Sequence, residues 1–244
     1  MELYEYSRII MIDTDILVRQ CPDEIFLRKA PSAVRRHPTG KYLDHQEMRT
    51  RTLFRDRNQI GGINAGFVLL KPSPRDVKRM VFELRTGMVS GEVPFKHGPE
   101  QDYLTRFYAH EDWQCLGIQW NFQLHQIVYC CRPGLQDCAR MTIPYDDIKI
   151  AHFSGALSLA QWVLDPVLHD AVSFDAFVRN HILGSFLASV DKESGDEDAK
   201  DIVKLRLQHV TEAACKEWYV KYEALDPRIK LLANHERKKA RRIL

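Results

Sequence analysis

The sequence predicts an α/β fold followed by a helical C-terminal segment. Two short, continuous apolar runs, at residues 9–12 and 67–70, are typical of strands that are buried on both faces of a sheet. Apolar residues at helical spacing over residues 77–84 follow the second run, and this alternation of strand and helix indicates an α/β sheet. From residue 157 onward the pattern is helical, with one long apolar stripe between residues 203 and 225.

Composition excludes several classes of protein. With 45% hydrophobic and 28% charged among 244 residues, the chain as a whole is not disordered. The 35 Lys and Arg against 33 Asp and Glu leave a formal charge of +2, which disfavours a dedicated nucleic-acid binder. The strongest apolar run, residues 65–70, is about a third of a membrane-spanning helix. Six cysteines without a C-x-x-C pair favour reduced, buried thiols over a disulfide scaffold or a zinc ribbon.

The first part of the chain is expected to hold one helix end, one strand and one loop. Residues 1–6 are expected to end a helix, and the strand at residues 8–12 then stops at Asp13-Thr14-Asp15. A short helix at residues 22–27 leads into residues 28–57, which hold nine Lys or Arg and show no sustained period. We expect this last stretch to be a long basic loop.

The second part is expected to alternate helices with strands. Ser73 is placed to cap a helix that ends at Gly87. Its face toward the sheet is predicted to carry Val77, Met80, Val81 and Leu84. A short helix is expected from Glu100 through Tyr108, a third strand at residues 148–153, and an acidic linker at residues 191–200. The chain ends in a basic segment at residues 237–242.

Asp13 and Asp15 lie where a buried strand gives way to a loop, at the edge where open α/β sheets bind ligands. Two carboxylates one residue apart suit a hard divalent cation such as Mg²⁺ or Mn²⁺. The structural alternative is that one aspartate caps the following turn and the other is solvated. Further polar or glycine positions lie beside predicted strands or at the start of a predicted helix. They are Asn64, Gly66, Glu100, Gln101, His152 and Gly155.

Five blocks, in order and at comparable gaps, resemble glycosyltransferase family 8, which includes glycogenin, galactinol synthases and bacterial lipopolysaccharide galactosyltransferases. Residues 8–18 (RIIMIDTDILV) resemble the metal-binding segment of the family, and residues 23–26 (DEIF) resemble its continuation. The other blocks are NAGFVLLKPS at residues 64–73, EQDYLTRF at 100–107, WNF at 120–122 and HFSG at 152–155. The resemblance runs from about residue 3 to residue 162.

The resemblance implies a nucleotide-binding α/β domain of the GT-A type with a mainly parallel sheet. We expect residues 1–165 to form this catalytic domain and residues 166–244 to form a helical extension with a basic tail. In the family the first βαβ units, which bind uracil and ribose, precede the metal segment, whereas 12 residues precede Asp13 here. The domain is therefore expected to be incomplete at its N-terminus and to expose an edge that an oligomer or a partner covers.

By resemblance, Asp13, Asp15 and His152 hold Mn²⁺, or Mg²⁺, against the diphosphate of a UDP-sugar. The resemblance also implies that Asn64, Ala65, Gly66 and Gly155 bind the donor. Glu100, Gln101 and Asp102 are expected to act at the sugar, where capping and turn formation are the alternatives for Glu100 and Asn64. The implied reaction is transfer of a hexosyl group to a carbohydrate or to a protein-linked or lipid-linked glycan, with retention of configuration.

One departure from the family pattern concerns the diphosphate. Ser158 takes the place of a lysine that binds it in the family, so Arg49 or Arg51 of the basic loop would have to replace that charge. The alternative function is an inactive, glycosyltransferase-like fragment that acts as an interaction module. No nucleic-acid partner is expected. A cytoplasmic location is expected, or the Golgi if a membrane anchor precedes the chain.

Overall fold

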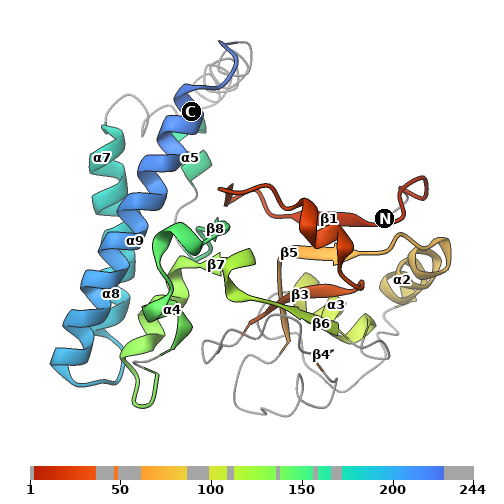
Figure 1. Cartoon of the computed structure of the whole chain (residues 1–244), viewed down its shortest axis with the longest axis horizontal. Coiled ribbons are helices and arrows are strands. Elements are labelled where there is room, and N and C mark those ends of the chain that lie inside the picture. The colour runs from red at the N-terminus through yellow and green to blue at the C-terminus, as the bar shows by residue number, and fades with distance from the viewer. Residues whose placement is uncertain are drawn as a thin grey trace. The chain divides into compact units, whose positions relative to one another are not determined.

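The computed structural model describes residues 3–36, 47–48, 62–86, 99–108, 113–135, 138–155, 159–165 and 172–227. Within these ranges the protein is a mixed α/β structure with two compact units (Figure 1). The first unit holds residues 1–14 and 18–121, and the second holds residues 15–17 and 122–244. The chain thus first passes from one unit to the other between Thr14 and Asp15. The predicted domain boundary at residue 165 stays a prediction.

The first unit is built on a five-stranded sheet in the order β1-β5-β3-β6-β4. These strands are β1 (Ile9–Ile12), β3 (Ser32–Arg35), β4 (Glu47–Met48), β5 (Ile63–Leu70) and β6 (Trp113–Leu116). The pairs β1–β5, β3–β5 and β4–β6 are antiparallel, and β3–β6 is parallel. The expectation of a mainly parallel sheet is therefore wrong for the described strands of this five-stranded sheet. Strand β3 also interrupts the segment that was expected to be a continuous basic loop.

Strand β5, an interior strand of this sheet, fulfils the prediction of burial on both faces, since all eight of its residues are buried. It begins at Ile63, four residues before the predicted start, because the polar-looking segment at its beginning is hydrogen-bonded inside the unit. Strand β1 does not fulfil it: β1 is an edge of this sheet, and Ile12 is 43% exposed. The residues that precede β1, 3–7, form turns and no helix, contrary to expectation.

Two helices accompany this sheet. Ser73 caps α2 (Pro74–Thr86) as predicted, because its Oγ accepts a hydrogen bond from the Asp76 amide at 3.2 Å. The predicted apolar face is wrong in part, since Met80 is buried but Val81 and Leu84 are exposed. Buried Glu83 takes their place toward the core.

Glu83 is kept inside by its partners. Its carboxylate accepts hydrogen bonds from Arg79 at 2.9 Å and from the Tyr103 hydroxyl at 3.1 Å. Burial and the nearby Glu83 carboxylate raise the pKa of Tyr103 to about 12, so the phenol stays a donor at neutral pH. These two hydrogen bonds allow the carboxyl group of Glu83 to be buried on the side of α2 that the sequence pattern predicted to be apolar.

The predicted helix at residues 100–108 is confirmed as α3 (Pro99–Phe107). Its Tyr103, Leu104 and Phe107 join β5 and β6 side chains in one core cluster. Its Thr105 packs against Gly62, whose φ of +110° suits glycine and whose added Cβ would lie 2.8 Å from Thr105 Oγ1. Gly62 thus lets α3 approach the start of β5 closely. The first unit also contains the expected short helix, η1 (Asp23–Leu27), and η2 (Ile118–Trp120).

The second unit combines a small sheet with helices. The sheet has the order β2-β8-β7, from β2 (Ile16–Val18), β8 (Ile150–His152) and β7 (Phe122–Gln123). Strand β8 confirms the predicted third strand, in a shorter form. The short helical elements of this unit are η3 (Leu124–Cys131), α4 (Ala139–Thr142), η4 (Tyr145–Asp147) and α5 (Leu159–Leu164).

The helical end of the chain is confirmed. A continuous helical stretch runs through α7 (Phe174–Phe177), the π-helical turn η5 (Val178–Leu183) and α8 (Gly184–Asp191), and a long helix, α9 (Glu197–Glu223), follows. The predicted stripe is buried at Val203, Leu207, Val210 and Ala214 and half-buried at Trp218 and Tyr222, but Leu225 lies beyond the helix and is exposed. The acidic linker is shorter than predicted, because α9 starts at Glu197 after the Asp196 cap.

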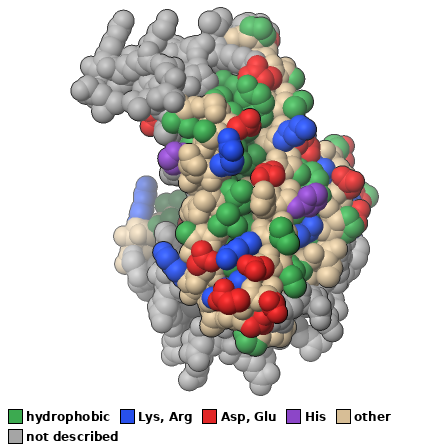
Figure 2. Space-filling model, turned by 90° about the vertical axis from the view of Figure 1, so that its left-hand side faces the viewer, with side chains coloured by type: hydrophobic (Ala, Val, Ile, Leu, Met, Phe, Trp, Pro, Cys, Tyr) green, Lys and Arg blue, Asp and Glu red, His purple; other side chains and the backbone are tan. Residues whose placement is uncertain are grey.

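The outer side of these helices is chemically mixed. Figure 2 shows apolar, acidic and basic side chains interspersed over the face that it views. Ile202, Leu205 and Val220 of α9 are 61%, 70% and 60% exposed. None of the helices in the described ranges combines the length and the apolar character that a membrane crossing requires.

Candidate metal and sugar site

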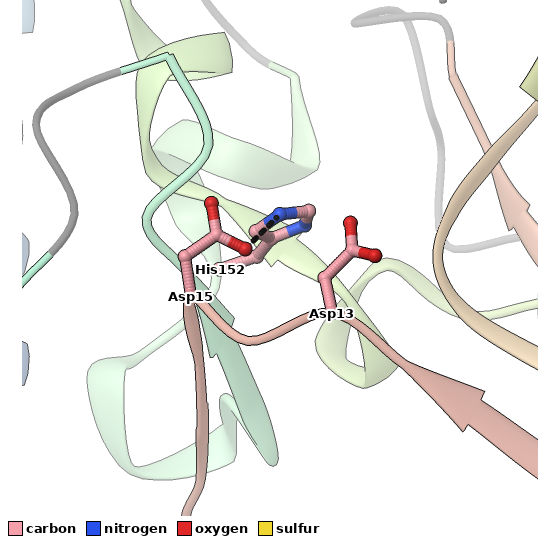
Figure 3. Close-up of side chains that lie close together, drawn as sticks. All are labelled: Asp13, Asp15 and His152. Carbon is pink, nitrogen blue, oxygen red and sulfur yellow. Dashed lines mark ion pairs between the residues drawn. The ribbon is translucent and has the colours of Figure 1, made fainter. Parts of the chain in front are cut away.

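The structure brings Asp13, Asp15 and His152 together. Asp15 follows the loop at the end of β1, and His152 is the last residue of β8. Their side chains form an ion pair, with His152 Nε2 at 3.2 Å from Asp15 Oδ1. The Phe153 amide donates to the Asp15 carbonyl at 2.9 Å, which fixes the backbone of Asp15 beside the end of β8. The carboxylate of Asp13 joins them from two residues earlier in the chain (Figure 3).

The three side chains form a donor set that suits a hard divalent ion. Their ligand atoms, one from each residue, all lie within 4.8 Å of one another. Two carboxylate oxygens and one imidazole nitrogen match the preferences of Mn²⁺, which accepts oxygen and nitrogen ligands at a little over about 2 Å. His152 is buried, Asp15 is partly buried and Asp13 is exposed, so the set is anchored on one side and open on the other.

Asp15 is held in the charged form that a cation needs. The hydrogen bond from His152 lowers the pKa of Asp15 below its ordinary value, and the charge of His152 adds to this effect. Burial opposes the shift, and nearby His125 supports it. Asp15 is therefore a carboxylate at neutral pH without a metal.

His125 is a residue that sequence reasoning missed. It belongs to η3, and its Nδ1 lies 2.9 Å from Ser154 Oγ, while its Nε2 lies 2.7 Å from Gln126 Nε2. Because an amide nitrogen only donates, Nε2 of a neutral His125 accepts this bond and Nδ1 donates to Ser154. A single histidine between Leu124 and Gln126 carries no motif, so the sequence held no signal for it.

Gly155 is required where it stands beside His125. Its φ is +83°, and an added Cβ would lie 3.1 Å from His125 Cγ and 3.2 Å from His125 Cβ. This is a physical reason for the glycine of the HFSG block that the sequence alone did not show. Ser158, Arg49 and Arg51, which the diphosphate prediction involves, lie outside the described residues.

We expect Gly155→Ala to destabilise the protein by about 1–2 kcal/mol, because a Cβ is unfavourable at positive φ. Gly134→Ala is the matched control, since Gly134 has a φ of +79° and no atom within 4 Å of its added Cβ. Urea unfolding measures both losses. We expect the Gly155 variant to lose more unfolding free energy than the Gly134 variant, and the difference is the cost of the contact with His125. Equal losses in the two variants would show that this contact adds no cost.

A polar network in the first unit joins the residues that were assigned to the sugar. Gln101 Oε1 accepts hydrogen bonds from Asn64 Nδ2 at 3.0 Å and from the Ala65 amide at 3.1 Å. Asn64 Oδ1 accepts from the Gly66 amide at 3.0 Å and from Asn121 Nδ2. The network therefore unites Asn64, Ala65, Gly66 and Gln101, and Asn121 is the member that comes from the WNF segment.

The backbone ties this network to the strand that precedes the metal cluster. The Asp13 amide donates to the Gly66 carbonyl at 2.9 Å, as an extension of the β1–β5 pairing. Asn64 and Asn121 are 5% and 0% exposed, so their amide groups are fixed by burial as well as by hydrogen bonds. That the network and the metal cluster bind one donor molecule stays a prediction.

The structure places Glu100 at the surface and Asp102 beside a cation. Glu100 is exposed in the first turn of α3. Asp102 pairs with Arg36, Oδ1 to Nη1 at 3.2 Å, and the two side chains are 12% and 11% exposed. Burial lowers the pKa of Arg36, and Asp102 and Glu100 oppose that shift, so the carboxylates stabilise a largely buried cation.

We expect Asp102→Asn to cost roughly 1–3 kcal/mol of stability, because it leaves the Arg36 guanidinium buried without its carboxylate. The double change Arg36→Gln with Asp102→Asn should recover part of this loss in urea unfolding. If the recovered double variant also keeps full turnover, Asp102 has only this structural role. If it is stable but inactive, Asp102 acts at the sugar as the resemblance implies.

No protein-family model matches the chain, and no solved structure matches it. A similar protein is an uncharacterized protein of Acanthamoeba polyphaga mimivirus, which is 26% identical over 162 residues. The similarity covers 64% of this chain and 50% of the viral protein, so the chain matches about half the length of that relative.

Proposed function

We propose that this protein is a retaining hexosyltransferase that takes its sugar from a UDP-sugar with Mn²⁺, or Mg²⁺, at Asp13, Asp15 and His152. The observation that carries the proposal is the meeting of these three side chains within 4.8 Å. A bound cation supplies the positive charge that neutralises the departing diphosphate. The protein holds it through a carboxylate that His152 already keeps ionised.

The sugar is proposed to lie against the network of Asn64 and Gln101. The amide oxygen of Gln101 accepts hydrogen bonds from the Asn64 side chain and from the Ala65 amide, and these two bonds fix the orientation of the Gln101 amide group. Its amide nitrogen is then the group that we assign to the donor sugar. A fixed donor that acts as charge develops at the sugar lowers the reaction barrier more than it strengthens ground-state binding.

His125 is proposed to take part in holding the diphosphate, where the family uses the lysine that Ser158 replaces. The ring lies close enough to Asp15 to lower the pKa of that carboxyl. Its position is fixed by Ser154, Gln126 and the close approach of Gly155. When diphosphate binds, the Nδ1 hydrogen would be donated to a phosphate oxygen in place of Ser154 Oγ, which is part of what a lysine does.

The fold supports the proposal at a coarse level. A mixed α/β structure with acidic residues after a strand is compatible with a GT-A-type catalytic domain at residues 1–165 and a helical extension at 166–244. The acceptor is proposed to be a carbohydrate or a protein-linked or lipid-linked glycan.

An interaction module without activity is the second candidate. The observation that favours it is Ser158, where the family pattern has the diphosphate lysine. Its binding surface would be the helical part of the second unit, where Leu205 and Val220 of α9 are exposed. Such a module would bind its partner equally well with and without a divalent cation.

Release of UDP from a panel of UDP-hexoses tests the proposal on the purified chain. We expect UDP to appear with one donor in the presence of Mn²⁺, more slowly with Mg²⁺, and at the background rate after EDTA treatment. NMR of the product should show the anomeric configuration of the donor. Background release with every donor, at a Mn²⁺ concentration that saturates the cluster, would support the interaction module instead.

A further inference from the structure

Two cysteine side chains meet in the second unit that belong neither to the metal cluster nor to the sugar network. Cys130 Sγ and Cys138 Sγ lie 2.8 Å apart. Cys130 is near the end of η3 and is 0% exposed, whereas Cys138 directly precedes α4 and is partly exposed. Cys138 is therefore the member of the pair nearer to the surface, and Cys130 is the buried member.

Two guanidinium groups surround this pair. Arg140 of α4 is 1% exposed, and Arg206 of α9 donates from Nε to the Arg140 carbonyl at 3.2 Å and from Nη2 to the Ile143 carbonyl. Burial lowers the pKa of both arginines, and the charges of Cys130 and Cys138 oppose the shift in each. Two cations thus lie close enough to the sulfurs to favour a thiolate among them.

The two thiols are chemically unequal. The hydrogen bond from Cys130 and the backbone amides of Met141 and Arg140 lower the pKa of Cys138 to about 6, against the effect of burial. Donating that hydrogen bond, together with burial, raises the pKa of Cys130. Cys138 is therefore the thiolate at neutral pH, and Cys130 is the protonated partner in contact with it.

We propose that Cys130 and Cys138 form a redox-active dithiol that reacts with small disulfides such as oxidised glutathione to give an intramolecular disulfide. The Cys138 thiolate attacks one sulfur of the disulfide, whose S–S bond breaks and releases one glutathione thiolate. Cys130 then gives its proton to the solvent and attacks Cys138 Sγ, which releases the second glutathione. Two protein thiols become one disulfide, and one glutathione disulfide becomes two thiols.

The other four cysteines differ from this pair. Cys21 is exposed, while Cys115, Cys131 and Cys215 are buried. Cys131 Sγ donates to the Val128 carbonyl at 3.2 Å, and burial raises the pKa of Cys215 to about 12. Cys131, next to Cys130 in the chain, therefore provides a matched control.

The test exposes the reduced full chain to oxidised glutathione, blocks the remaining thiols by alkylation and maps the peptides by mass spectrometry. The wild-type chain should lose two hydrogens and yield one linked peptide pair that contains Cys130 and Cys138. The Cys131→Ser variant should form the same disulfide. The Cys130→Ser variant should instead keep glutathione on Cys138, because no second thiol displaces it.

Three results would overturn the proposal. In the wild-type chain, Cys138 stays free while Cys21 takes up glutathione, Cys138 keeps its glutathione as in the Cys130→Ser variant, or the disulfide joins other cysteines. The mapping of the wild-type chain decides this even if a variant fails to fold.

The pH dependence of alkylation gives an independent reading. Three charged or titratable groups act on Cys138, which are Cys130 of η3, Arg140 of α4 and Arg206 of α9, and Cys131 of η3 acts on Cys130 beside it. We expect the alkylation rate of Cys138 in the wild-type chain to reach half its maximum at about pH 6. A midpoint at the ordinary thiol value of 9.0 would show that Cys138 is not the attacking thiolate.

Discussion

Changing Asp15 to asparagine is expected to lower the affinity of the protein for Mn²⁺ by about 100-fold or more, since even the loss of an outer partner of a metal ligand costs about 10–100-fold. The amide keeps the size of the side chain but removes the charge and one anionic oxygen. It also replaces the carboxylate that His152 Nε2 contacts at 3.2 Å. Calorimetric titration with Mn²⁺ measures the loss.

Asp198→Asn is the matched control, because this substitution removes the same charge from a residue that is exposed in the first turn of α9. It should leave Mn²⁺ affinity within about twofold of wild type, as a distant surface charge is screened by salt. Equal Mn²⁺ affinity in the Asp15 variant and the wild type would remove Asp15 from the metal site.

The pH dependence of Mn²⁺ binding follows from the same ligands. Ligands must be deprotonated, so affinity should fall as the pH is lowered. Because the pKa of Asp15 is held below its ordinary value, this carboxylate keeps its charge as the pH falls toward that ordinary value, and its contribution is lost only below it.

Changing Gln101 to alanine is expected to cost about 2–4 kcal/mol of stability and to lower kcat. The change deprives the Asn64 side chain and the Ala65 amide of a shared acceptor, and each donor left unsatisfied costs roughly 1–3 kcal/mol. The loss of kcat should exceed any rise in KM, because the proposed contact of the Gln101 amide nitrogen acts mainly in the transition state.

Gln101→Glu separates the two roles of this side chain. Glutamate keeps an acceptor oxygen for Asn64 and Ala65 but has no amide nitrogen to donate to the sugar. We expect its urea midpoint to lie near that of the wild type while its kcat falls about as far as that of the alanine variant. Normal kcat in a stable glutamate variant would limit Gln101 to a structural role.

Local patterns predicted the elements that depend on neighbouring residues in the chain. The buried run of β5, the Ser73 cap and the stripe of α9 are all encoded within one or two turns or one strand, so spacing reveals them. The prediction of the apolar face of α2 was wrong in part, because the Tyr103 hydroxyl of α3 donates a hydrogen bond to Glu83 and keeps it buried. Periodicity records which residues are apolar and carries no information on such distant hydrogen bonds.

The same limit applies to the candidate site. The ordered blocks placed His152 with Asp13 and Asp15 by resemblance, and the structure brings these residues together across more than a hundred positions. Asp102 pairs with Arg36, 66 positions away, and His125 depends on contacts with Ser154 and Gly155. Neither pairing leaves a local signal. The edge position of β1 is likewise a property of strand order, which a single apolar run does not encode.

Electron paramagnetic resonance of free Mn²⁺ tests the central claim most directly, when the protein is titrated with and without UDP. If the ion at Asp13, Asp15 and His152 binds the diphosphate of UDP, then UDP raises the affinity for Mn²⁺ by the same factor by which Mn²⁺ raises the affinity for UDP. We predict one bound Mn²⁺ per chain and an affinity at least about tenfold higher in the presence of UDP. A Mn²⁺ affinity that UDP leaves unchanged would contradict a sugar-nucleotide site at this cluster.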